Sequence, residues 1–245
     1  MAFGRKSRPE EPFEPVHWND ITKFTVGRMT RHTFRASKRG AGPHAVRFHR
    51  RRGGEDHMVP GVYIVPAAPP ATLSKGGFLL FEDEGNRQLL CNVLPDGSDR
   101  YRVTDAGGQE LGSVRRTSIT KKLTYQGLWL EQVGQPAVVA RHHWARGGLL
   151  ASAERGAGHV LGGVVDSLLS FGAEGGDRAT DFKPVVWAVE TDGPKGERGE
   201  AVLTVPRTTG SVTWYFVMRE GWLDKRLAFA LAVLRESETF GADRR

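Results

Sequence analysis

The chain has 245 residues, enough to bury a sizeable hydrophobic core in one large domain or two small ones. Its single cysteine, Cys91, excludes an internal disulfide framework and a cysteine-rich zinc site, and we interpret it as a small buried hydrophobe. The formal net charge of +7 belongs to one end of the chain, because residues 1–60 carry 13 Lys and Arg against 6 Asp and Glu, whereas residues 61–245 carry 22 of each.

Neither export nor a membrane-spanning segment is expected. The first twelve residues are charged and contain no apolar stretch of the kind a secretory signal needs. The longest uninterrupted apolar run, residues 227–234, is far shorter than the roughly 20 residues that a helix needs to cross a bilayer. We therefore expect a cytoplasmic protein, with peripheral attachment to a membrane as one possible location.

The N-terminal region is predicted to be a basic arm over residues 1–56, partly irregular, that can be removed without unfolding the rest. Residues 1–20 are charged and Pro-rich, which is typical of an irregular lead-in. Apolar residues such as Phe24, Val46 and Phe48 lie among the cations that follow, so this part can fold locally or dock on the body. Residues 21–52 contain no acid and ten cations, namely Lys23, Arg28, Arg31, Arg35, Lys38, Arg39, Arg47, Arg50, Arg51 and Arg52.

The remainder, residues 57–245, is predicted to be one mainly β domain with at least eight strands. Apolar runs and alternating patterns are separated by turn residues, including the segments 95–98 and 105–108, and a Pro-rich break follows residue 65. The strand candidates are residues 58–65, 77–81, 88–93, 101–104, 111–116, 123–131, 136–144, 185–189, 201–205 and 212–218.

Two helices are predicted. Residues 158–171 have a helical stripe of apolar residues, although paired glycines weaken the pattern. Residues 227–234 are apolar on all sides, with polar residues before and after them and a stop at Gly241. A helix that is apolar all round must be buried all round, so we expect a closed antiparallel β-barrel around this C-terminal helix.

Two segments resemble the tubby-like superfamily, which includes phospholipid scramblases and LURP-one-related proteins. Residues 101–116, YRVTDAGGQELGSVRR, resemble a strand, turn and strand of that group, and residues 222–234, WLDKRLAFALAVL, resemble its terminal helix. The resemblance covers roughly residues 75–240. It implies a closed twelve-stranded barrel around a hydrophobic helix, and some members of the group bind phosphoinositides or other anionic lipids. Function in the group is heterogeneous.

No catalytic, cofactor or metal site is predicted, and the sequence favours a protein that is not an enzyme. Nucleophile-elbow, zinc-protease and phosphate-loop motifs are absent from the sequence. The glycines of residues 156–162 miss the dinucleotide-binding spacing by one residue. His142 and His143 would point to opposite faces of a strand, and His32, His44, His49 and His57 are interpreted as solvated residues near the arm.

The arm carries the functional prediction. Ten cations without acids repel one another, and an anionic surface relieves that repulsion. The leading hypothesis is a binding protein whose arm engages an anionic partner, preferably a membrane surface. Nucleic-acid binding through residues 47–52 and a structural or adaptor role in a protein assembly are the alternatives. A second group of cations enlarges the basic surface if the fold brings it near, namely Arg115, Arg116, Lys121 and Lys122.

Overall fold

The computed structural model describes residues 16–31, 40–52, 55–68, 73–117, 127–140, 185–191, 199–206 and 215–242. Within these ranges there are three helical segments, η1 (Trp18–Asp20), α1 (Leu73–Gly76) and α4 (Lys225–Ala242). The strands in the same ranges are β1 (Lys23–Arg31), β2 (Gly40–Arg52), β3 (Glu55–Pro66), β4 (Phe78–Phe81), β5 (Leu89–Pro95), β6 (Arg100–Asp105), β7 (Glu110–Arg116), β8 (Leu128–Gln132), β9 (Val138–Ala140), β10 (Val185–Val189), β11 (Ala201–Val205) and β12 (Phe216–Met218).

These twelve strands form one closed antiparallel barrel. Each strand pairs with its neighbours in the chain, and β1 pairs with β12 to close the sheet, with Lys23 opposite Val217 and Phe24 opposite Phe216. The short connections contain the predicted turns, where Gly97 and Gly108 adopt φ values of 86° and 84° that favour glycine. The prediction of a closed antiparallel β-barrel is confirmed.

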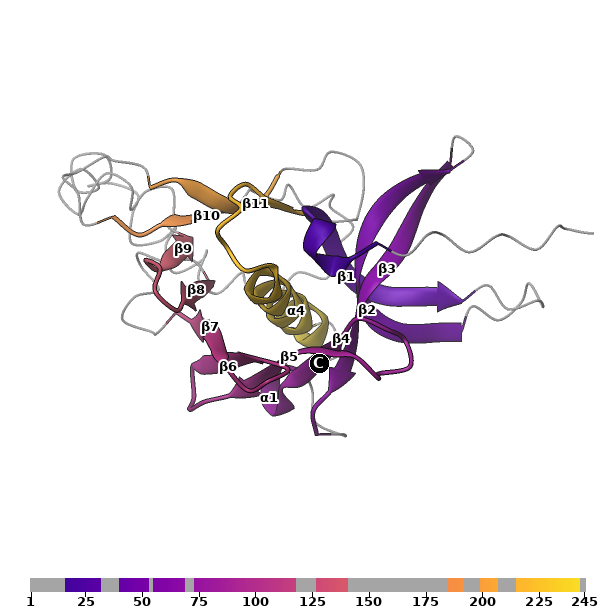
Figure 1. Ribbon diagram of the computed structural model, residues 1–245, viewed down its shortest axis with the longest axis horizontal. Coiled ribbons are helices and arrows are strands. Elements are labelled where there is room, and N and C mark those ends of the chain that lie inside the picture. Colours follow the sequence, from indigo (N-terminus) through magenta and orange to yellow (C-terminus); the bar gives the residue numbers. More distant parts are fainter. Residues whose placement is uncertain are drawn as a thin grey trace, which may run out of the picture.

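Helix α4 runs through the middle of the barrel (Figure 1). Every residue from Leu227 to Leu234 has 0% of its surface exposed, because inward-facing side chains of the strands surround all sides of the helix. Phe229 meets Phe24 of β1 edge to face, with ring centroids 4.8 Å apart. The prediction of a buried apolar helix is confirmed, and the helix ends one residue beyond Gly241.

The structure corrects the prediction of a separate basic arm. Residues 23–31 and 40–52 form β1 and β2 of the barrel, and the expected boundary at residues 56 and 57 falls inside β3. Phe24, Val26, Val46 and Phe48 are buried in the core, so these strands obey the same inward alternation as the others. Removal of residues 1–56 would delete two strands of the closed sheet and leave the barrel open between β3 and β12.

Strand predictions over the described residues agree with the observed strands, from β3 at the prediction for 58–65 to β12 at the prediction for 212–218. Residues 123–126 and 141–144, and the first residues of the last prediction, lie outside the described ranges. The helix predicted over residues 158–171 and the glycines of 156–162 also lie outside them.

Candidate anion-binding surface

The basic strands β1 and β2 form a hairpin that extends beyond the body of the barrel. They pair from Thr25 opposite Arg47 to Arg31 opposite Gly40, whereas β1 pairs with β12 at only two described positions. In Figure 1 this hairpin extends on the right-hand side of the molecule. Residues 23–47 contain seven Lys and Arg and no Asp or Glu. The β1–β2 hairpin is therefore an acid-free, cationic element.

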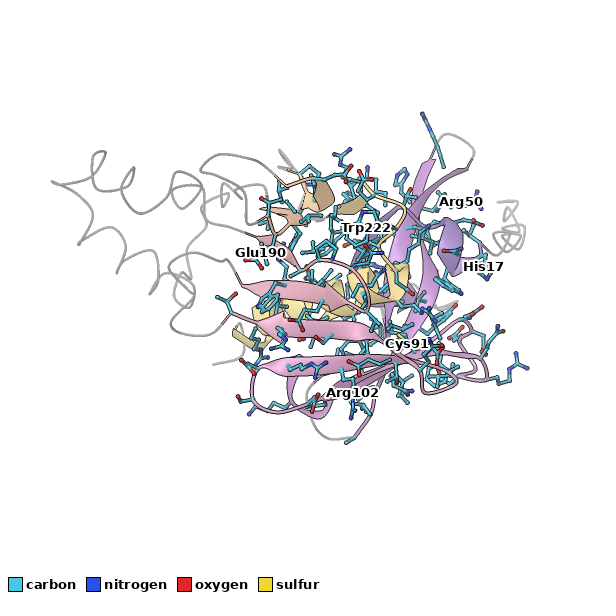
Figure 2. The ribbon with its side chains drawn as sticks, turned by 60° about the vertical axis from the view of Figure 1, so that its left-hand side comes forward. His17, Arg50, Cys91, Arg102, Glu190 and Trp222 are labelled. Carbon is cyan, nitrogen blue, oxygen red and sulfur yellow. The ribbon has the colours of Figure 1, made fainter. Side chains whose placement is uncertain are left out.

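A second hairpin, β2–β3, carries the run of three arginines but also carries acids. The register places Arg50 opposite His57, Arg51 opposite Asp56 and Arg52 opposite Glu55. Directly opposed residues of unlike charge attract each other across an antiparallel pair. The guanidinium of Arg50 lies 5.8 Å from the ring centroid of Phe48. Figure 2 shows Arg50 on the right-hand side of the view. The β2–β3 hairpin therefore carries acids at the positions opposite two of its arginines.

Lys23 and Arg47 lie on the outer face of the barrel, at the base of the β1–β2 hairpin. The ammonium of Lys23 lies 4.6 Å from the ring centroid of Tyr215, a cation–π contact. The guanidinium of Arg47 lies against Gly27, and a Cβ atom at that glycine would overlap it. Partial burial lowers the pKa of Arg47, and the nearby Tyr215 acts in the opposite direction. This guanidinium is consequently partly desolvated.

Arg115 and Arg116 do not join the basic hairpins, because β7 is separated from β2 by four strands of the barrel. Arg115 donates from Nε to a carboxylate oxygen of Glu131 at 2.7 Å and lies 5.6 Å from the ring centroid of Trp129. Arg116 lies 5.4 Å from the ring centroid of Tyr101. Both contact neighbours in the sheet, and a role for these two residues in anion binding stays a prediction.

A shallow depression beside β7 contains charged groups that already pair with one another. Arg100 forms ion pairs with Asp96 at 3.0 Å and Glu110 at 2.7 Å, and Glu131 also accepts a hydrogen bond from the Ser113 hydroxyl at 3.0 Å. These contacts satisfy the carboxylates across the outer face of the sheet. The charged groups of the depression are therefore engaged in ion pairs with one another.

The remaining predicted anion-binding residues divide into two groups. For some, the structure gives the strand but not the side chain, namely Arg28, Arg31 and Arg52. Others lie outside the described residues, namely Arg35, Lys38, Arg39, Lys121 and Lys122. Of the cations predicted to bind anions, the described side chains on the hairpins are Lys23, Arg47, Arg50 and Arg51.

Metal ligation and thiol chemistry gain no support from the described part of the chain. Its His, Cys, Asp and Glu residues form no group of three that could hold a metal ion. His142 and His143 lie outside it, and so does His32. Cys91 is fully buried on β5, and burial raises the pKa of its thiol to about 12, which disfavours the thiolate.

Sequence reasoning missed Tyr215, which contacts Lys23 and Met58 on the outer face. Its position in the strand pattern was visible, but its cross-strand neighbours depend on barrel closure.

Across the described ranges, no helix is both long and apolar enough to cross a membrane. Comparisons with protein-family models, curated proteins and solved structures find no match to this chain.

Proposed function

We propose that this chain is a binding protein whose β1–β2 hairpin engages an anionic partner, preferably a membrane surface, with a tubby-like barrel as its scaffold. The observation that carries the proposal is the absence of any Asp or Glu from residues 23–47, a segment that includes β1 and the part of β2 paired with it. In isolation its cations repel one another, and an anionic surface relieves the repulsion while it releases counterions.

A membrane surface is the preferred partner on two grounds. Each cation near an anionic leaflet contributes about 1 kcal/mol of attraction, so a few hairpin cations suffice for reversible binding. The resemblance of residues 101–116 and 222–234 to the tubby-like superfamily points the same way, because some members of that group bind anionic lipids. The proposed function therefore combines diffuse electrostatic attraction with a rigid barrel that presents the hairpin.

Nucleic-acid binding is less favoured, because the arginine run proposed for phosphate contacts lies on the β2–β3 hairpin. There Asp56 and Glu55 stand opposite Arg51 and Arg52 and would repel phosphates. An adaptor role, in which the hairpin binds a protein partner, also uses the cationic surface. Competition by duplex DNA for vesicle-bound protein, measured over a salt series, separates the lipid and nucleic-acid hypotheses.

The direct test compares two double variants of the full chain. Arg28→Gln with Arg31→Gln removes two hairpin cations, whereas Arg102→Gln with Lys75→Gln removes two exposed cations from β6 and α1. In Figure 2, Arg102 lies at the lower edge of the barrel, away from Arg50. Co-sedimentation with phosphatidylserine-containing vesicles should show about thirtyfold weaker binding for the hairpin variant, from the loss of about 2 kcal/mol.

The control variant should bind like the wild type, and binding of both should weaken as ionic strength rises. Equal affinity of the hairpin variant and the wild type would refute the role of the hairpin. Equal binding of the wild type to pure phosphatidylcholine vesicles would refute the requirement for an anionic surface.

A further inference from the structure

We infer that the outer face of the barrel, where β12, β1 and β2 adjoin, binds one tetrahedral oxyanion of the phosphate or sulfate class. The ligands would be the Lys23 ammonium, the Arg47 guanidinium and the Tyr215 hydroxyl. The inference rests on the proposed function, since Lys23 and Arg47 belong to the cationic β1–β2 hairpin. It adds a discrete site to the diffuse attraction of that hairpin.

The strand register brings the three residues to one region of the sheet. Phe24 lies opposite Phe216, so the preceding Tyr215 adjoins Thr25, and Thr25 lies opposite Arg47 on β2. The hydroxyl of Tyr215 reaches the sulfur of Met58 on β3 at 3.8 Å. Its side chain therefore crosses the outer face from β12 towards β3, past the pair formed by Thr25 and Arg47. The 3% exposure of Thr25 agrees with a cover of this kind.

The Tyr215 hydroxyl can donate a hydrogen bond to a ligand. Its described hydrogen-bond partner is a thioether sulfur, which is a weak acceptor. An oxyanion is a far stronger acceptor, and hydrogen bonds to charged oxygens are about twice as strong as those between neutral groups. A ligand oxygen near this hydroxyl would therefore displace the sulfur contact readily.

Lys23 contacts the ring of Tyr215, and Arg47 lies on the next strand of the sheet. Lys23 places its ammonium 4.6 Å from the ring centroid of Tyr215, and no ion pair joins Lys23 to a carboxylate in the described part of the chain. Arg47 lies on the neighbouring strand, opposite Thr25, the residue that Tyr215 adjoins. Two cations and one hydroxyl donor on this part of the outer face have the chemistry that a phosphate or sulfate group prefers.

Gly27 leaves room for the Arg47 guanidinium to lie on the outer face of the sheet. It lies two residues beyond Thr25 on β1, opposite Ala45, and the Arg47 guanidinium occupies the volume that a side chain would fill. The guanidinium is thereby held on the sheet in a partly desolvated position, where an ionic partner is worth more than in bulk water.

The experiment measures binding of inorganic phosphate by titration calorimetry, at constant ionic strength maintained with chloride. Tyr215→Phe removes the hydroxyl but keeps the ring beneath Lys23, so it isolates one ligand without altering charge. Tyr101→Phe, which removes a phenolic hydroxyl on β6, is the matched control. We expect saturable binding by the wild type and the control, and about tenfold weaker binding by Tyr215→Phe, the loss of roughly one charge-assisted hydrogen bond.

Vesicles with phosphatidic acid identify the source of the phosphate group. A loss for Tyr215→Phe with both these vesicles and inorganic phosphate supports the site and indicates a lipid headgroup, whereas a loss with inorganic phosphate alone supports the site and indicates a free anion. No saturable phosphate binding by the wild type, or equal affinity of the wild type and Tyr215→Phe, would overturn the inference. Failure of the Arg28 and Arg31 vesicle test, with phosphate binding intact, would overturn the membrane proposal alone.

Discussion

Asp224 and Arg226 form a two-point ion pair at the N-terminus of α4, with Nε 3.0 Å from Oδ1 and Nη2 2.7 Å from Oδ2. The Asp224 Oδ1 atom also accepts the backbone N–H of Arg226 at 2.9 Å, and the backbone N–H of Asp224 donates to Gln132 of β8 at 2.7 Å. The guanidinium of Arg226 lies 5.5 Å from the ring centroid of Trp18 in η1. These contacts tie one end of the buried helix to the barrel.

Asp224→Ala should lower the free energy of unfolding by about 2 to 3 kcal/mol. The variant loses an N-cap, which contributes about 1 kcal/mol, and leaves the partly buried guanidinium of Arg226 without its carboxylate. Asp224→Asn keeps a capping acceptor and should lose less. Urea unfolding followed by circular dichroism measures both. Wild-type stability of Asp224→Ala would show that the cap and ion pair contribute nothing.

Glu236, on α4 beyond the apolar segment, should make stability depend on pH. Burial raises the pKa of its carboxyl, and the neighbouring Arg235 opposes this only in part. The folded state therefore holds the proton more tightly than the unfolded chain, so this contribution to stability is present at low pH and is lost as pH rises through the folded-state pKa.

Glu236→Gln stays neutral and should be more stable than the wild type near neutral pH. The difference should vanish below the ordinary pKa of a glutamate, where the wild-type carboxyl is protonated in both states. Exposed Glu200→Gln is the control. Thermal unfolding midpoints between pH 3.5 and 8 provide the measurement, and a pH-independent difference between Glu236→Gln and the wild type would contradict the role of burial.

The sequence predicted the strands from β3 onward and the buried helix because their signals are local. Leu227 to Leu234 are apolar on every side, and turn residues such as Gly97 and Gly108 punctuate the strands. For β1 and β2, the high density of cations concealed an inward alternation that was present at Phe24 and Val26 and at Val46 and Phe48. The charge of this segment predicted an arm. The apolar side chains at alternate positions are instead buried in the core, and the segment forms strands of the barrel.

The candidate site was harder to predict, because it depends on which residues become cross-strand neighbours. The two glycines at positions 53 and 54 are a hairpin signal that would have placed Glu55 and Asp56 opposite the arginine run. The proximity of Tyr215 to Lys23 and Arg47 required closure of β1 on β12, across nearly the whole chain. No local pattern contains that information.

Cys91 should be inert towards thiol reagents in the folded protein. Its side chain has 0% exposure, and burial raises its pKa to about 12, so neither access nor ionisation favours reaction at pH 8. Ellman's reagent should react slowly with the native protein and rapidly in 6 M guanidinium chloride. Comparable rates in the two conditions would show that β5 opens readily or that the thiol is exposed.

Gly112 should tolerate substitution less well than Gly108, although both have positive φ values, of 154° and 84°. A Cβ atom at Gly112 would overlap the carbonyl oxygen of Glu131 on β8, whereas nothing lies within 4 Å of one at Gly108. Gly108→Ala should therefore cost about 1 kcal/mol from backbone strain alone, and Gly112→Ala about 3 kcal/mol or more, because β7 and β8 must also separate. Urea unfolding of the two variants measures the difference. Similar losses of stability in the two variants would mean that the close approach of β7 and β8 does not constrain the barrel. This close approach lies next to the irregular register between β6 and β7.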